Sequence, residues 1–128
     1  LEYAAWIEWN GLEQKVVIWD WQTNNMATIS ANSPLSLTAD GEWLGWSEDG
    51  AVVKHNVLSQ ERVVIQTGTV HGIAMYGGQL CWSEWHEQDI DVFCDDGFHL
   101  QRDGHQLWPQ LHKSGLYFLE SGSLMWLR

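Results

Sequence analysis

The chain has 128 residues and a formal net charge of −11, because 17 Asp and Glu residues are set against only 6 Lys and Arg residues. This length suits one domain with a buried core, and the shortage of basic residues disfavours nucleic acid and anionic lipid as partners. No apolar run approaches the roughly 20 residues of a membrane span, so we expect a soluble protein, cytoplasmic or periplasmic, without membrane insertion. The sequence begins without Met, as expected of a processed product, a tag remnant or an excised piece of something longer.

A short motif recurs four times along the chain. In each copy, a small or aromatic residue is followed by an aromatic residue, a variable residue and Glu. The copies are Ala5–Glu8, Gly45–Glu48, Cys81–Glu84 and Tyr117–Glu120. Their aromatic residues lie 40, 36 and 36 residues apart. A period of this length in a strand-rich sequence is typical of the blades of a β-propeller.

The motifs belong to a series of short apolar-rich segments separated by turn residues, which predicts antiparallel hairpins. In chain order, we expect strands at residues 5–8, 15–21 and 26–30, then 34–38, 45–48, 51–57 and 62–66, then 70–76, 80–85, 90–94 and 98–101, and finally 106–111, 117–120 and 123–127. No segment has sustained apolar spacing at three and four residues, so we expect essentially no helix.

The predicted fold class is all-β, a β-propeller-like array of antiparallel four-stranded blades that forms an incomplete ring, or half-propeller. A single domain, 1–128, would hold a partial blade at about 3–30, full blades at 33–67 and 69–102, and a second partial blade at 105–128. Large indole side chains would fill the space between neighbouring blades. Each end blade would leave one apolar face uncovered, so an open array of this kind should associate.

Three segments resemble the repeats of TolB-like propellers, which also occur in prolyl-oligopeptidase-type peptidases. Ser36–Ser47 (SLTADGEWLGWS) is similar to their SPDG-x-x-(I/L)-A-(F/W)-S signature, and Asp89–Gly97 (DIDVFCDDG) is similar to their D-I-Y-V-x-D-x-D-G strand and corner. Trp108–Phe118 (WPQLHKSGLYF) resembles P-x-x-S-P-D-G-x-x-I-x-F with its Ser-Pro-Asp replaced. The resemblance implies a ring of six to eight blades, which is more than this chain supplies.

The two cysteines, Cys81 and Cys94, fall on facing strands of one hairpin. A turn centred between Glu87 and Gln88 places them directly opposite each other, so a cross-strand disulfide is geometrically feasible. Two buried, unbridged thiols are the favoured alternative. The compartment is not decided by this cysteine count.

The glutamates that end the four motifs, Glu8, Glu48, Glu84 and Glu120, would cluster at one rim of an assembled propeller and could attract a cation or a basic peptide. The favoured alternative is that each accepts hydrogen bonds from amides of its own corner. Trp9 and Trp85 follow two of these glutamates, and exposed indoles at a rim are suited to holding sugars or peptides. For these indoles, the favoured alternative is packing between blades or a self-association surface. With the neighbouring His86, these residues are the candidate ligand-binding or partner-binding set.

Metal, cofactor and catalytic sites have little support in the sequence. Asp89 and Asp91 are separated by a strand from Asp95 and Asp96, so we expect turn carboxylates rather than a calcium site. The six histidines, at positions 55, 71, 86, 99, 105 and 112, show no HxH or HExxH spacing, so no zinc site is predicted. No Gly-x-Ser-x-Gly elbow or phosphate-binding glycine loop is present, and we predict that the chain is not an enzyme.

Three functions are consistent with these features. The first is a non-catalytic interaction scaffold that self-associates, as a dimer, through its open blades. The second is a lectin-like module that binds carbohydrate or another small ligand through Trp9, Trp85 and the acidic rim. The third is the substrate-binding propeller piece of a larger peptidase, whose hydrolase domain would lie outside this sequence.

Overall fold

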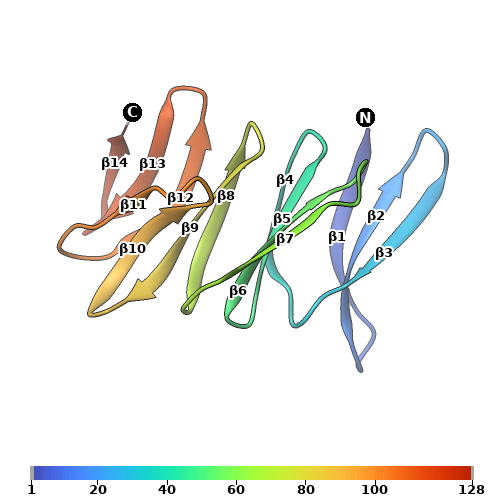
Figure 1. The fold of residues 1–128 in the computed structure, drawn as a ribbon, viewed down its shortest axis with the longest axis horizontal. Coiled ribbons are helices and arrows are strands. Elements are labelled where there is room, and N and C mark those ends of the chain that lie inside the picture. Colours follow the sequence, from blue (N-terminus) through green and yellow to red (C-terminus); the bar gives the residue numbers. More distant parts are fainter. Residues whose placement is uncertain (1, 128) are drawn as a thin grey trace.

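The computed structural model describes residues 2–127, which form four antiparallel β-sheets and contain no helix (Figure 1). The all-β class and the antiparallel pairing are therefore confirmed. None of the described residues belongs to a helix of the length and apolarity that a membrane crossing needs.

Each sheet is a run of hairpins in chain order, and we number the sheets from the N-terminus. The first sheet contains β1 (Tyr3–Trp9), β2 (Gln14–Asp20) and β3 (Asn25–Ser30). The second contains β4 (Leu35–Asp40), β5 (Trp43–Glu48), β6 (Ala51–Asn56) and β7 (Arg62–Gln66). The third contains β8 (Val70–Tyr76), β9 (Gln79–His86), β10 (Asp89–Cys94) and β11 (His99–Leu100), and the fourth contains β12 (Gln106–His112), β13 (Gly115–Glu120) and β14 (Ser123–Leu127).

The four sheets stand in a row, from the first near the N-terminus to the fourth near the C-terminus (Figure 1). Three apolar clusters lie between successive sheets. They are centred on Val16 and Trp46, on Val52 and Trp82, and on Val92 and Phe118. We call the face that a sheet turns toward the preceding sheet its leading face, and the opposite face its trailing face.

The motif aromatics of the last three sheets occupy matching positions on leading faces. Trp46 is 0% exposed, Trp82 3% and Phe118 1%, and each packs in the cluster shared with the preceding sheet. Trp46 Nε1 donates a hydrogen bond to Glu48 Oε1 at 2.9 Å, and Trp82 Nε1 donates to Glu84 Oε1 at the same distance. The indole is thus buried without leaving its only polar atom unpaired.

The first strands of the last three sheets share a β-bulge that the sequence did not reveal. Pairing is interrupted between Leu35 and Thr38, between Val70 and Ile73, and between Leu107 and Gln110. A residue with positive φ lies inside each interruption: Ser36 (53°), Gly72 (107°) and Trp108 (49°), at intervals of 36 residues. These strands also lie side by side, since β8 contacts both β4 and β12.

Cys81 and Cys94 face each other across β9 and β10 in the predicted register, and they are joined by a disulfide. The favoured expectation of two unbridged thiols is therefore wrong. The bridge lies in the cluster between the third and fourth sheets, where Cys81 is 0% and Cys94 6% exposed. A position opposite on neighbouring strands brings the two Cβ atoms within reach of each other.

The expected strand 98–101 is shorter in the structure, where β11 covers only His99–Leu100. Phe98 belongs to the preceding turn, because its backbone N–H donates to Asp96 Oδ1 at 3.0 Å and its carbonyl accepts from Cys94 N–H at 2.9 Å. The third sheet therefore ends in a very short outer strand.

Candidate functional site

The leading face of the first sheet has no sheet packed on it among the described residues. Tyr3, Ala5 and Ile18 pack toward the second sheet. Side chains alternate between the two faces of a strand, so the residues between them point the other way. This leading face carries Ala4, Trp6, Val17, Trp19 and Met26.

Exposure and pairing show that this face is apolar and aromatic. Trp6 lies opposite Val17, and Trp19 lies opposite Met26. Met26 is 66% exposed, whereas Val17 is only 3% exposed. Lys15 and Glu8 form a 3.3 Å ion pair at one end of the face and give it a polar border.

The trailing face of the fourth sheet is the second uncovered apolar surface. Leu116, Phe118, Met125 and Leu127 pack toward the third sheet. The alternating residues on the other face are Tyr117, Leu119, Leu124 and Trp126. Leu124 is 69% and Trp126 49% exposed, and the Tyr117 and Trp126 rings stack with centroids 6.1 Å apart.

The two end faces are of the same two kinds that pack against each other at each junction between neighbouring sheets. Between neighbouring sheets, a trailing face always meets a leading face that carries a motif aromatic. Trp6 holds the motif position on the first sheet and is not among the buried core residues. One chain therefore exposes both kinds of surface that its interior pairs together.

The four predicted glutamates are each engaged within the fold. Glu8 pairs with Lys15 at 3.3 Å, Glu48 with Arg62 at 3.4 Å and Glu120 with Arg102 at 3.1 Å. Glu84 accepts hydrogen bonds from the Trp82 indole and from the Gly68 backbone N–H. Corner amides are therefore not their general partners, because indoles and basic side chains supply most of the contacts. Binding of a cation or basic peptide by a ring of these groups stays a prediction.

The predicted rim tryptophans are exposed, Trp9 by 70% and Trp85 by 47%. Trp9 borders a groove of about 390 Å³ that also includes Gln14 and Asn32. Trp85 lies on β9, within the strand expected at residues 80–85, and its ring packs against His105 with centroids 5.5 Å apart. The third predicted residue, His86, contacts Phe93 and His99 rather than either tryptophan. Carbohydrate binding by this set stays a prediction.

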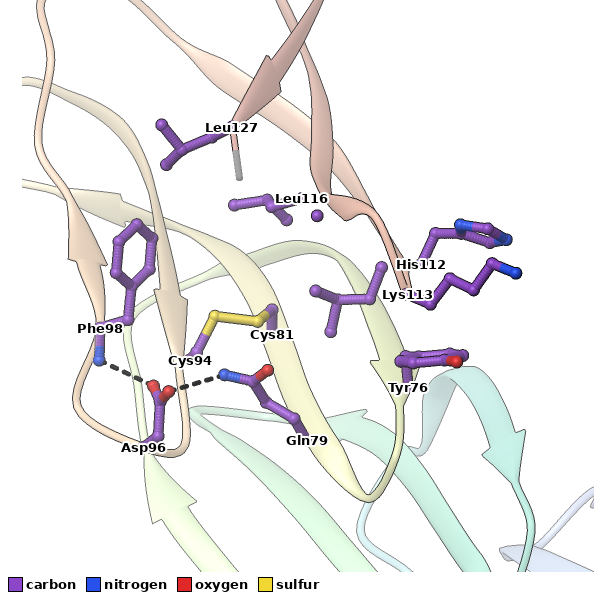
Figure 2. Close-up of a pocket in the computed structure, with 12 residues that line it drawn as sticks. Tyr76, Gln79, Cys81, Cys94, Asp96, Phe98, His112, Lys113, Leu116 and Leu127 are labelled. Carbon is purple, nitrogen blue, oxygen red and sulfur yellow. Dashed lines mark hydrogen bonds between the residues drawn. A yellow bond between two sulfur atoms is a disulfide. The ribbon is translucent and has the colours of Figure 1, made fainter.

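A cleft of about 330 Å³ opens between the third and fourth sheets (Figure 2). The Cys81–Cys94 disulfide lies in it, with Phe98, Leu116 and Leu127 around the bridge. Gln79 Nε2 donates to Asp96 Oδ2 at 2.8 Å at one edge, and Figure 2 shows His112 and Lys113 extending from the opposite side. The lining combines apolar residues around the disulfide with the polar side chains of Gln79, Asp96, His112 and Lys113.

Comparison with protein-family models, with curated proteins and with solved structures finds no match to this chain. The resemblance to TolB-like repeats therefore stays a prediction. The sequence predicted that each end blade would leave one apolar face uncovered, but the residues of these two faces were not named from it. The alternation of side chains along the predicted end strands could have identified the residues of the uncovered faces. On the first sheet, for example, it places Trp6 and Trp19 on one face and Ala5 and Ile18 on the other.

Proposed function

We propose that this chain is a non-catalytic interaction scaffold built from propeller-like blades, and that it associates head to tail with a second copy. The leading face of one copy would pack on the trailing face of the other. The observation that carries the proposal is that Trp6 occupies, on an uncovered face, the position at which Trp46, Trp82 and Phe118 are buried between sheets.

The arrangement of strands supports the propeller interpretation. β4, β8 and β12, which begin their sheets, form a contiguous row, as the innermost strands of neighbouring blades do. Bulges at 36-residue intervals in these strands support a repeated unit of that length. The first sheet would then lack an innermost strand and the fourth an outermost strand.

Head-to-tail packing explains why the two end faces differ. Face-to-face association would bring one leading face onto another, a pairing that none of the three internal junctions uses. Burial of one Met or Leu side chain contributes about 1.5–3 kcal/mol, and a standard interface covers about 800 Å² per partner. In a closed dimer, each leading face packs on the partner's trailing face, so two such junctions form. If the geometry leaves one leading and one trailing face free, further copies add and a filament results.

Analytical ultracentrifugation of charge variants tests the proposal. We expect the unmodified chain to be dimeric at micromolar concentration. Met26→Lys on the leading face and Leu124→Lys on the trailing face should each weaken association by about tenfold or more, since each removes apolar burial and introduces a charge without a partner.

Leu58→Lys is the matched control, because Leu58 is 62% exposed but lies in the turn after β6, away from both end faces. This variant should associate like the unmodified chain. A chain that is monomeric at 100 μM would overturn the proposal, and so would equal loss of association in all three variants.

A further inference from the structure

Three side chains with metal-binding groups converge on the leading face of the third sheet. His86 lies on β9, Asp91 on β10 and His99 on β11. Their ligand atoms all lie within 4.8 Å of one another. His86 pairs with Asp89 and His99 with Phe93, so each histidine is the diagonal neighbour of Asp91 across one strand pair.

The bonding of these residues leaves one buried oxygen unexplained. The Asp91 side chain is 0% exposed, and its Oδ2 lies 2.8 Å from His99 Nε2. Its Oδ1 is also buried and has no hydrogen-bond partner in the described part of the chain. A buried carboxylate oxygen is normally paired. Asp91 Oδ1 therefore lacks a partner that its burial requires.

The two histidines are positioned by aromatic contacts and remain accessible. The His99 ring stacks on Phe93 with centroids 4.0 Å apart, and His86 packs edge-on against both rings. The side chains of His86 and His99 are 39% and 28% exposed. An ion can therefore reach the two imidazoles from solvent, with Asp91 at the closed side of the group.

We propose that His86, Asp91 and His99 bind a divalent transition-metal ion of the zinc class. Two imidazoles and one carboxylate suit Zn²⁺ and Co²⁺, and three protein ligands leave a further position for water. An ion among the three groups replaces the Asp91–His99 hydrogen bond and gives the buried carboxylate a charged partner. Both cysteines are held in the disulfide, so no thiolate competes for the metal.

Bound metal would fix the outermost strand of the third sheet. β11 has two residues and pairs with β10 at two positions only, Val92 with Leu100 and Phe93 with His99. A metal that links His99 to β9 and β10 holds this strand by a second kind of bond. This role goes beyond head-to-tail association and does not depend on it.

Isothermal titration of ZnCl₂ into the full chain, in a non-chelating buffer, tests the site. We expect one ion per chain, and His86→Gln should lower the affinity at least tenfold. His86 has no hydrogen bond to Asp91 or His99 among the contacts of residues 2–127, so this variant preserves the Asp91–His99 bond and the fold. The matched control is His71→Gln, an exposed histidine on β8, which should bind zinc like the unmodified chain.

Co²⁺ gives a second measurement, because its visible absorption reports coordination by nitrogen and oxygen ligands. We expect this band in the unmodified chain and in His71→Gln, and its loss in His86→Gln. Absence of binding at 1 mM zinc, equal binding by the two variants, or half an ion per chain, which indicates an ion shared between copies, would each overturn the proposal. Failure of head-to-tail association in the ultracentrifuge leaves these outcomes unaffected.

Discussion

His55 lies on β6 with only 5% of the residue exposed, and both ring nitrogens lack hydrogen-bond partners within the described residues. Its ring packs near Trp46, with centroids 6.3 Å apart. Burial, and secondly the positive charge of Arg62, lower the pKa of His55 below its ordinary value. The neutral imidazole is therefore the form that the fold accepts.

The lowered pKa predicts a loss of stability in acid. The unfolded chain binds a proton at His55 near pH 6.5, whereas the folded chain resists it, so the contribution is complete above that pH and is lost as the pH falls below it. His55→Leu should remove this part of the pH dependence. Urea unfolding followed by tryptophan fluorescence at pH 7.5 and pH 5 measures the effect.

In that experiment, His71→Gln serves as the control, because His71 is exposed. It should retain the acid sensitivity of the unmodified chain. If His55→Leu loses as much stability between the two pH values as the unmodified chain does, His55 is not the group responsible.

For single residues, the sequence predicted which residues lie directly opposite each other on one hairpin, but it did not predict which residues are diagonal neighbours across several strands. The register of Cys81 opposite Cys94 follows from the turn between them, but the state of the two thiols does not. His86, Asp91 and His99 are separated by 5 and 8 residues, which matches no metal motif. Only the pairing of three strands brings them together, and no single hairpin contains all three residues.

Among the elements, the bulged strands show the clearest local constraint. Gly72 has a φ of 107°, and a Cβ at this position would lie 3.3 Å from the Trp108 side chain. Trp108 is itself the bulge residue of β12, so the bulges of neighbouring sheets touch. The bulges went unpredicted because only one of the three residues with positive φ is Gly; the others, Ser36 and Trp108, carry no such signal in their type.

Gly72→Ala should destabilise the fold by about 1–3 kcal/mol, because alanine is strained at this φ and its methyl group crowds Trp108. Gly11→Ala isolates the effect of the crowding, since Gly11 has a φ of 90° but a Cβ at this position would meet nothing within 4 Å. That control should cost about 1 kcal/mol. Urea unfolding compares the two, and equal losses would show that contact between the bulges contributes nothing.

For the whole molecule, the sequence predicted an all-β chain with antiparallel sheets because its period and turn residues are local signals. The packing of one sheet on the next is not local, and it depends on which face of each strand carries the motif aromatic. The alternation of residues along each strand shows which side chains share a face, but it does not show which face meets the preceding sheet. The structure supplies this, because it places Trp46, Trp82 and Phe118 on equivalent faces.

A mixing experiment distinguishes head-to-tail from face-to-face association. Met26→Lys leaves the trailing face unchanged, and Leu124→Lys leaves the leading face unchanged, so an equimolar mixture can form one unmodified junction per pair. We expect each variant alone to sediment as a monomer and the mixture to sediment faster. If like faces met, one of the two variants alone would still dimerise, because its leading or its trailing face is unmodified; that result would overturn head-to-tail association.

The interior junctions all join the same two kinds of face, and the ends expose those same two kinds. The chemistry of the ends is therefore independent of how many sheets stand between them. A genetic duplication or deletion of one 36-residue unit would lengthen or shorten the array while preserving both terminal surfaces. Under the proposed association, such an event would change how many copies complete an assembly without requiring any new contact to evolve.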